Sequence, residues 1–163
     1  MDGILLRPAG ADDLDMVWKL FKTVIDEAVY YPYDEHATRE EIEHSWINLD
    51  NQIAVAESDG AIFGAYILRP NQAGYGDHIV NAAYMVAPSA RGRNVGRLLG
   101  EHSIGYAREL GYYAMQFNYV VSTNTAAVQL WQKLGFSIIG TVPGGFRHRD
   151  LGMVDVHIMF LKL

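Results

Sequence analysis

The feature that most constrains the fold is the segment 86–99, Val-Ala-Pro-Ser-Ala-Arg-Gly-Arg-Asn-Val-Gly-Arg-Leu-Leu. Residues 78–86 before it are typical of a strand, which Pro88 terminates, and residues 94–110 carry apolar side chains at helical spacing. A strand that leads through a short turn directly into a helix requires a fold in which helices pack against a sheet.

The turn between this strand and this helix is suited to an anion. Backbone N–H groups are unpaired at a helix N-terminus, where the helix dipole also favours negative charge. Gly92 and Gly96 carry no Cβ and allow close approach, and Asn94 tolerates a left-handed conformation. Positive charge comes from Arg91, Arg93 and Arg97. A helix start with a solvated basic rim explains the same residues, so composition alone leaves both interpretations open.

The rest of the chain continues the alternation of strands and helices. Strands are expected at 3–8, 52–57, 61–68, 78–86, 112–121, 136–140 and 154–163. Helices are expected from Asp12 or Asp13 to Ala28, from a capping box at Thr38 with Leu49 buried, and at 94–110 and 124–134. This order predicts an α/β (α+β) fold, with a mixed and mainly antiparallel sheet flanked by helices. Residues 1–163 are expected to form a single domain.

Composition excludes several classes of function. The net charge is −6, which argues against a nucleic-acid partner, and the absence of cysteine excludes thiolate chemistry. The histidines form no His-x-x-x-His pair, so no metal site is expected. The longest apolar run, 61–68, is shorter than a membrane span, and the first residues do not resemble a signal peptide. We therefore expect a cytoplasmic protein without a membrane partner.

Two motifs resemble those of the GCN5-related N-acetyltransferases (GNAT). The loop Arg91-Gly92-Arg93-Asn94-Val95-Gly96 is similar to the family's pyrophosphate loop, Arg/Gln-x-x-Gly-x-Gly/Ala, with Asn94 in place of a glycine. Residues 124–136 resemble the family's Asn-x-x-Ala…Tyr-x-x-x-Gly-Phe helix. The two motifs occur in the family's order and cover residues 79–140.

The resemblance implies a GNAT fold in which the central strands 78–86 and 112–121 splay apart and hold acetyl-coenzyme A (acetyl-CoA). The implied cofactor-binding residues are Met85, Val86, Ala87, Arg91, Gly92, Arg93, Asn94, Val95, Gly96, Arg97, Asn124 and Trp131. A backbone N–H among Met85 to Ala87 is implied to polarise the thioester carbonyl. Trp131 stands where many members carry a tyrosine that protonates the leaving thiolate, and an indole N–H cannot do so. Either fixed dipoles assist the thiolate or another group donates the proton.

A narrower resemblance is to the fungal azetidine-2-carboxylate/proline-analogue acetyltransferases and their bacterial relatives. It rests on the segments 81–86, 110–112, 117–120 and 124–127, and that subgroup also has tryptophan at the position of Trp131. It implies that Asn81 and Asn118 act as the catalytic-site residues that hold an amino-acid substrate, and that Asn124 contacts the pantetheine arm. A structural explanation exists for each: the first two amides can bridge backbone groups where the strands separate, and Asn124 can cap a helix.

Other candidates are weaker. Tyr30, Tyr31 and Tyr33 can wall a substrate pocket or simply pack, and His148 can be a base or a solvated loop residue. Asp155 is expected to pair with an arginine. No residue stands out as the general base.

The sequence predicts an acetyl-CoA-dependent N-acetyltransferase that acts on a small amine, an amino acid or an analogue, by direct attack in a ternary complex. Acetylation of a protein N-terminus or of a polyamine is an alternative within enzymes. A non-catalytic coenzyme A-binding regulatory module is the alternative outside them, and a homodimer stays open.

Overall fold

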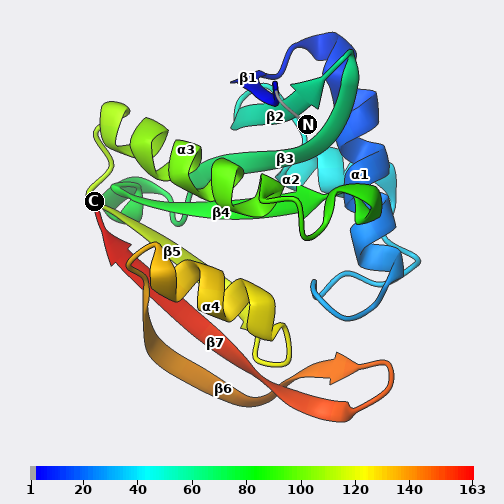
Figure 1. Ribbon diagram of the computed structural model, residues 1–163. Coiled ribbons are helices and arrows are strands. Elements are labelled where there is room, and N and C mark those ends of the chain that lie inside the picture. The colour runs from blue at the N-terminus through cyan, green and yellow to red at the C-terminus, as the bar shows by residue number, and fades with distance from the viewer. Residues whose placement is uncertain (1–2) are drawn as a thin grey trace.

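Alternating apolar residues along the chain form the strands of one mixed sheet, which the computed structural model describes over residues 3–163 (Figure 1). The strands are β1 Leu5–Pro8, β2 Gln52–Ser58, β3 Ala61–Pro70, β4 Ile79–Val86, β5 Ala114–Val121, β6 Ser137–His148 and β7 Gly152–Lys162. Their order in the sheet is β1-β2-β3-β4-β5-β7-β6, and every neighbouring pair is antiparallel except β4 and β5. The predicted mixed, mainly antiparallel sheet is confirmed.

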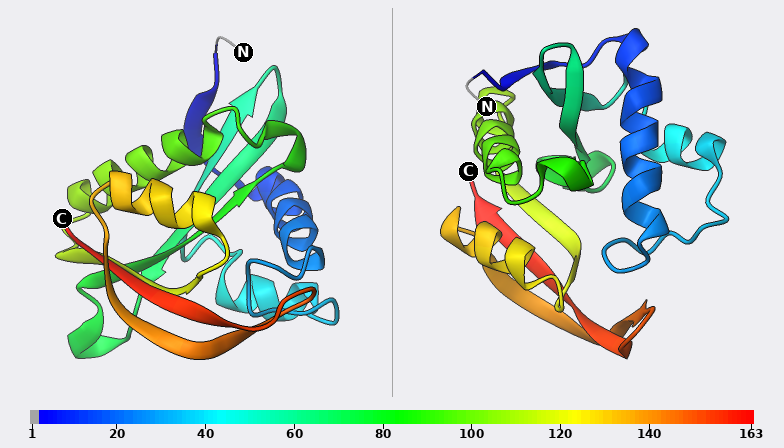
Figure 2. Two further views of the ribbon diagram at one scale, coloured as in Figure 1. Left: turned by 60° about the horizontal axis from the view of Figure 1, so that its bottom comes forward. Right: turned by 45° about the vertical axis from the view of Figure 1, so that its right-hand side comes forward.

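Helices cover both faces of this sheet, and each face has its own core. The helices are α1 Leu14–Asp26, α2 Arg39–Ser45, α3 Val95–Glu109 and α4 Thr125–Lys133. Figure 2 shows α1 and α2 on one side of strands β2 to β4 and α3 on the other. The core under α1 and α2 includes Phe21, Ile42 and Met85, whereas Leu99, Phe117 and Trp131 belong to the core under α3 and α4. We call these the α1/α2 face and the α3/α4 face.

The two parallel strands β4 and β5 pair over a very short length. Their register joins Ile79 to Ala114 and Val80 to Met115, and no pairing continues beyond these residues within the described chain. From there the strands diverge toward Val86 and Val121, so the expected splay of the central strands is confirmed. Backbone groups along the diverging edges lack a strand partner and must bond elsewhere.

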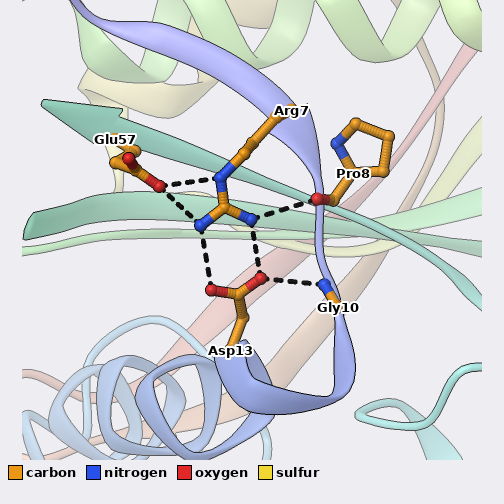
Figure 3. A network of polar contacts seen from close by, with 5 residues as sticks. All are labelled: Arg7, Pro8, Gly10, Asp13 and Glu57. Carbon is orange, nitrogen blue, oxygen red and sulfur yellow. Dashed lines mark hydrogen bonds and ion pairs between the residues drawn. The ribbon is translucent and has the colours of Figure 1, made fainter. Parts of the chain in front are cut away.

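A polar network fixes the first strand to its neighbours (Figure 3). The Arg7 guanidinium donates two hydrogen bonds to the Asp13 carboxylate, at 2.7 and 3.0 Å, and its Nε donates to Glu57 Oε2 at 2.7 Å. Asp13 also accepts the N–H of Gly10. The hydrogen bonds from Arg7 hold the pKa of the Asp13 carboxyl below its usual value. The network joins β1, the turn before α1 and β2.

The second helix begins as predicted and ends early. Thr38 Oγ1 accepts the Glu41 N–H, and Glu41 Oε2 accepts the Thr38 N–H at 2.9 Å, which confirms the capping box. The helix stops at Ser45, so the expectation that Leu49 is buried is wrong: Leu49 is 55% exposed. The Asn48 side chain donates to the Glu43 carbonyl and thereby satisfies a carbonyl of the last turn.

The C-terminal hairpin is longer than predicted. Strand β6 was expected to end at Gly140 but continues to His148, and β7 begins at Gly152. Glycine and proline are depleted in strands, and for that reason the segment 143–145 reads as a loop. The residues on either side of it pair with β7, Val142 with Val156 and Phe146 with Val154, and the register shift between Val142 and Phe146 accommodates the segment. The Asp155 carboxylate accepts the Gly144 N–H at 2.9 Å, so the expected arginine partner of Asp155 is wrong. No helix among residues 3–163 is long and apolar enough to cross a bilayer.

Candidate active site

The turn between β4 and α3 adopts the conformation that its residues allow. Gly92 has φ +73° and Asn94 has φ +67°, so both occupy the left-handed region, as predicted for Asn94. Asn94 lies directly before the first helical residue, Val95, and no side chain of the described residues caps this end of α3. The N–H groups of the first turn of α3 are therefore available to an anion.

A cavity of about 550 Å³ opens between the start of α3 and the diverging strands β4 and β5. Most of the predicted cofactor residues line it, namely Val86, Arg91, Gly92, Asn94, Val95, Gly96, Arg97, Asn124 and Trp131. Met85, Ala87 and Arg93 do not, and the Met85 side chain is buried in the core of the α1/α2 face. A Cβ on Gly96 would lie 3.7 Å from Leu130 Cδ2 and 3.9 Å from Val86 Cγ2, in the cavity wall.

The three arginines of the loop differ in their partners. Arg91 Nη1 donates to Glu27 Oε2 at 2.9 Å, and its guanidinium lies 5.5 Å from the centroid of the Tyr30 ring. This hydrogen bond raises the pKa of Arg91. Arg97 pairs with Glu101 one turn along α3, whereas Arg93 reaches only the Ser89 carbonyl, at 3.4 Å. Among the loop arginines, Arg93 is therefore the one that no carboxylate of residues 3–163 pairs with, and it lies beside the cavity without lining it.

The free edge of β4 determines which backbone groups a ligand can reach. In an antiparallel pair, alternate residues direct both backbone groups toward the neighbouring strand. The Ala87 N–H bonds the Phe63 carbonyl at 2.8 Å on the β3 side, so Met85 also faces β3, and the groups of Tyr84 and Val86 face β5. Of Met85, Val86 and Ala87, which were expected to offer backbone groups to the cofactor, only Val86 therefore directs its backbone groups toward the gap between β4 and β5.

The backbone groups of Tyr84, the other residue that faces the gap, are bonded to the side chain of Tyr31. Its hydroxyl donates to the Tyr84 carbonyl at 2.7 Å and accepts the Tyr84 N–H at 3.0 Å. Burial raises the pKa of this phenol to about 12. The ring also lines the cavity and lies 5.7 Å from the centroid of Phe21 in α1. The sequence left open whether Tyr31 walls a pocket or packs, and the ring does both; its bonds to Tyr84 had no signal in the sequence.

Two residues of α4 form part of the cavity wall. The Asn124 side chain accepts the Ala127 N–H at 3.2 Å, so its predicted helix-cap role is present at a position that also lines the cavity. The Trp131 ring is 7% exposed and lies 4.6 Å from the Tyr84 ring and 4.8 Å from the Phe117 ring. Trp131 is thus a packing residue at the cavity wall.

Asn81 and Asn118 lie where the strands part, and neither lines this cavity. Asn81 is 7% exposed, and its Oδ1 accepts the N–H of the next residue, Ala82. Asn118 is exposed; its Nδ2 donates to Asn71 Oδ1 at 2.6 Å and its Oδ1 accepts from Gln116 Nε2 at 2.9 Å. Because side chains alternate along a strand, Asn81 shares the α1/α2 face with the buried Met85.

A cation missed by the sequence analysis lies directly opposite Asn81. Arg69 is the β3 partner of Asn81 in the register, so the two side chains share a face. Its guanidinium lies 4.0 Å from the Trp46 ring centroid, and Nη1 donates to the Ser45 carbonyl at 2.7 Å, while the buried Nε has no partner. No carboxylate pairs with Arg69 within residues 3–163.

The remaining candidates lie outside the cavity. Tyr33 accepts a hydrogen bond from Trp46 Nε1 at 2.8 Å and packs on Phe21, so it belongs to the core. His148 ends β6 and accepts the Asp150 N–H at 3.1 Å. Within the part of the chain that the structure describes, no three His, Asp or Glu side chains gather as metal ligands.

Comparisons with known proteins agree with this geometry. The profile of the "Acetyltransferase (GNAT) family" matches residues 18–136. N-acetyltransferase aca1 of Schizosaccharomyces pombe is 30% identical in an alignment of 145 residues that covers 78% of this chain and 69% of that protein. A GCN5-related N-acetyltransferase from Kribbella flavida superposes with a TM-score of 0.93 at 39% identity, and 98% of each chain is covered. Ribosomal-protein-alanine N-acetyltransferase from Brucella melitensis superposes with a TM-score of 0.84 at 25% identity, over 98% of this chain and all of the other.

Proposed function

The chain belongs to the GNAT acetyltransferase family and is an N-acetyltransferase, and from that premise we propose that it transfers the acetyl group of acetyl-CoA to a free amino acid or an amino-acid analogue. One observation carries the choice of acceptor. Asn81 and Asn118, on neighbouring strands, lie where those strands part, and the register places a cation beside Asn81. We propose further that residues 1–163 act as one N-acetyltransferase domain.

The cavity on the α3/α4 face fits the donor. Its loop end offers unpaired N–H groups at the start of α3 and the Arg93 guanidinium nearby, which suit a pyrophosphate. Its middle offers the backbone groups of Val86, which suit the amides of a pantetheine arm, and the apolar wall formed by Leu130 and Trp131. Acetyl-CoA supplies the activated acyl group, and these residues bind and orient it.

The polar residues on the α1/α2 face fit the acceptor. Neutral amides bind an ammonium or amine and a carboxylate without adding a charge that must itself be desolvated. Arg69 supplies the positive charge that a carboxylate needs, because no carboxylate of the described chain neutralises it. An acceptor that carries both an amine and a carboxylate therefore matches this set better than a polyamine does.

Acetylation of a peptide N-terminus is the second candidate. It is favoured by the similarity to a protein whose name is ribosomal-protein-alanine N-acetyltransferase. The two candidates differ in the group attached beyond the amine: a free amino acid presents its carboxylate to Arg69, whereas a peptide presents a neutral amide and a long chain.

A coenzyme A-release assay over matched amines tests the proposal. The panel contains proline, azetidine-2-carboxylate, prolinamide, an alanyl peptide and spermidine. We expect the free acids to react fastest and prolinamide to react at least about tenfold more slowly, the discrimination that loss of a buried ionic hydrogen bond gives. Preference for the peptide or spermidine contradicts the acceptor class. Acetyl-CoA that binds without turnover on any amine favours a non-catalytic module.

A further inference from the structure

The sulfur of coenzyme A must receive a proton as it departs, and the indole of Trp131 cannot donate it. Among the described residues that line the cavity there is no Asp, Glu, His, Lys, Ser or Thr. The groups with an acidic O–H are four phenols, those of Tyr30, Tyr31, Tyr84 and Tyr119. A donor among them must place its hydroxyl on the diverging edge of β4, where the acyl group has to be presented.

Three of the phenols are directed elsewhere. The Tyr84 hydroxyl shares a hydrogen bond of 2.8 Å with Ser103 Oγ of the buried face of α3. The Tyr119 hydroxyl donates to the Gly145 carbonyl at 2.6 Å, in the C-terminal hairpin. The Tyr30 ring lies under the Arg91 guanidinium, at the loop end of the cavity.

Tyr31 differs because its hydroxyl lies on the strand edge itself. It bonds both the N–H and the carbonyl of Tyr84, the residue that precedes Val86 on the edge facing the gap. A thioester carbonyl that takes the Tyr84 N–H replaces the Tyr31 oxygen there. The ring stays close because it packs on Phe21 of α1, so the hydroxyl remains beside the incoming thioester.

We propose that the Tyr31 hydroxyl is the catalytic proton donor to the sulfur of coenzyme A, in the function that Trp131 cannot perform. The inference rests on the proposed acetyl transfer at this cleft, whichever amine accepts the group. As the amine nitrogen forms its bond to the acyl carbon, the C–S bond breaks and its electron pair goes to sulfur. The Tyr31 O–H proton moves to sulfur, and the phenolate recovers a proton that the attacking nitrogen releases through water.

The position of Tyr31, and not its acidity, selects it as the donor. Burial raises the pKa of the phenol to about 12, so the hydroxyl keeps its proton at neutral pH until charge develops on the sulfur beside it. The same phenol competes with the thioester for the Tyr84 N–H in the free enzyme. Removal of the Tyr31 hydroxyl is therefore expected to slow turnover and, at the same time, to tighten the binding of acetyl-CoA.

The test compares Tyr31→Phe with Tyr33→Phe. Tyr33 lies in the same connection, packs on the same Phe21 and also uses its hydroxyl in a hydrogen bond, with Trp46, but it does not line the cavity. We expect Tyr31→Phe to lower kcat by about 100-fold or more and to abolish the solvent isotope effect on kcat, as loss of general-acid catalysis does. Its Kd for acetyl-CoA, from calorimetry without an acceptor, is expected to tighten by about threefold to tenfold, since the free state loses a bonded partner. Tyr33→Phe is expected to change neither quantity.

Three results overturn the inference. The first is equal kcat for the two variants, and the second is an unchanged isotope effect in Tyr31→Phe. The third is a weakened Kd together with a lowered kcat, which identifies Tyr31 as a structural residue. If Tyr31→Phe does not fold, Tyr31→3,5-difluorotyrosine keeps the ring and the hydroxyl. Fluorination lowers the pKa of the phenol, so an alkaline fall of kcat is expected in a pH range where the parent, with a phenol pKa of about 12, shows none. An unmoved profile contradicts the proposal.

Failure of the acceptor assignment is distinguishable from failure of this inference. If the enzyme acetylates peptides and no free amino acid, the acceptor proposal fails, and the same variants are compared with the peptide as substrate. The calorimetric comparison needs no acceptor at all.

Discussion

The two sides of the parted strands are built in different ways. On the α3/α4 face, two contiguous segments, 86–97 and 124–131, supply most of the cavity wall, largely through backbone groups and helix ends. On the α1/α2 face, single polar side chains come from β3, β4, β5 and the connection between β3 and β4. The donor side is local in sequence, and the acceptor side exists only once the sheet has its register.

This difference has a consequence for substitutions. A backbone-built site fails when a side chain intrudes, whereas a side-chain-built site fails when one group is deleted. Variants on the donor side should therefore change the Kd of acetyl-CoA, and variants on the acceptor side should change kcat/KM of the amine. A donor-side variant that changes only kcat/KM of the amine, or an acceptor-side variant that changes the Kd of acetyl-CoA, contradicts this division.

The largest effect is expected for Gly96→Val. The branched side chain enters the cavity between Leu130 and Val86, and we expect the Kd of acetyl-CoA to weaken by about 100-fold, or ~2.7 kcal/mol. The new Cβ meets its neighbours at ordinary contact distance, so the free energy of unfolding should change by less than about 1 kcal/mol. Calorimetry and denaturant unfolding measure the two quantities.

Gly105→Val is the matched control for this variant, because Gly105 lies in the same helix with open space around its Cβ position. It should leave the Kd unchanged. A grossly unfolded Gly96→Val protein with a stable Gly105→Val protein would identify Gly96 as a packing residue.

The next effect is expected on the other side, for Asn118→Ala and Asn81→Ala. Each should lower kcat/KM of the amino acid by about 10- to 100-fold, or roughly 1–3 kcal/mol, because the bound substrate loses a hydrogen-bond partner in the closed complex. The Kd of acetyl-CoA should stay the same, and the double variant should be less than additive if both amides hold one substrate.

Asn71→Ala separates substrate binding from a structural bridge. It removes the partner of Asn118 and leaves the Asn118 amide in place. If the Asn118–Asn71 contact only closes the gap between strands, Asn71→Ala and Asn118→Ala will have equal effects, and the acceptor role of Asn118 is lost.

A smaller effect is expected for the double variant Arg91→Glu, Arg93→Glu. Because Arg91 already pairs with Glu27, reversal of both charges should weaken acetyl-CoA binding by about tenfold, seen as a smaller ligand-induced rise in Tm. Reversal of Arg108 and Arg147 changes the net charge equally outside the cavity and should leave the rise intact. Equal rises in both double variants would remove the phosphate role from this loop.

The smallest effect is expected for Trp131→Phe. Its ring packs between Tyr84 and Phe117, so kcat should change by less than about threefold, below 1 kcal/mol in the barrier. Stability should fall by about 1–2 kcal/mol, as for other large-to-small core changes. Stopped-flow turnover and thermal unfolding measure these values; a loss of several hundredfold in kcat would return the proton-donor role to this position.

The local half of the site could be predicted from sequence because its cause is local. The left-handed turn at Asn94, the cap at Asn124 and the cavity-lining loop follow from residue types within a few positions of one another. The same reasoning found the capping box at Thr38, and the family resemblance supplied the splay of the central strands.

The features of the site and of the fold that the sequence did not predict depend on contacts between residues far apart in the chain. The bond between Tyr31 and Tyr84 spans 53 residues, and Arg69 faces Asn81 only through the register of β3 and β4. The same register decides that Val86, and neither Met85 nor Ala87, turns its backbone groups toward the gap. In β6, the pairing of Val142 and Phe146 with β7 continues the strand on both sides of the proline and glycines at 143–145, which lie within a register shift.

The shape of the hairpin β6–β7 also bears on how copies of this protein behave toward one another in a crowded cell. Strand β6 is the outermost strand at its end of the sheet and is 12 residues long, a length at which an unpaired edge can recruit other strands. Pro143 removes one N–H donor from that edge, and the register shift between Val142 and Phe146 bends it out of line. The departures from regular geometry that concealed this strand in the sequence therefore protect the molecule from edge-to-edge aggregation.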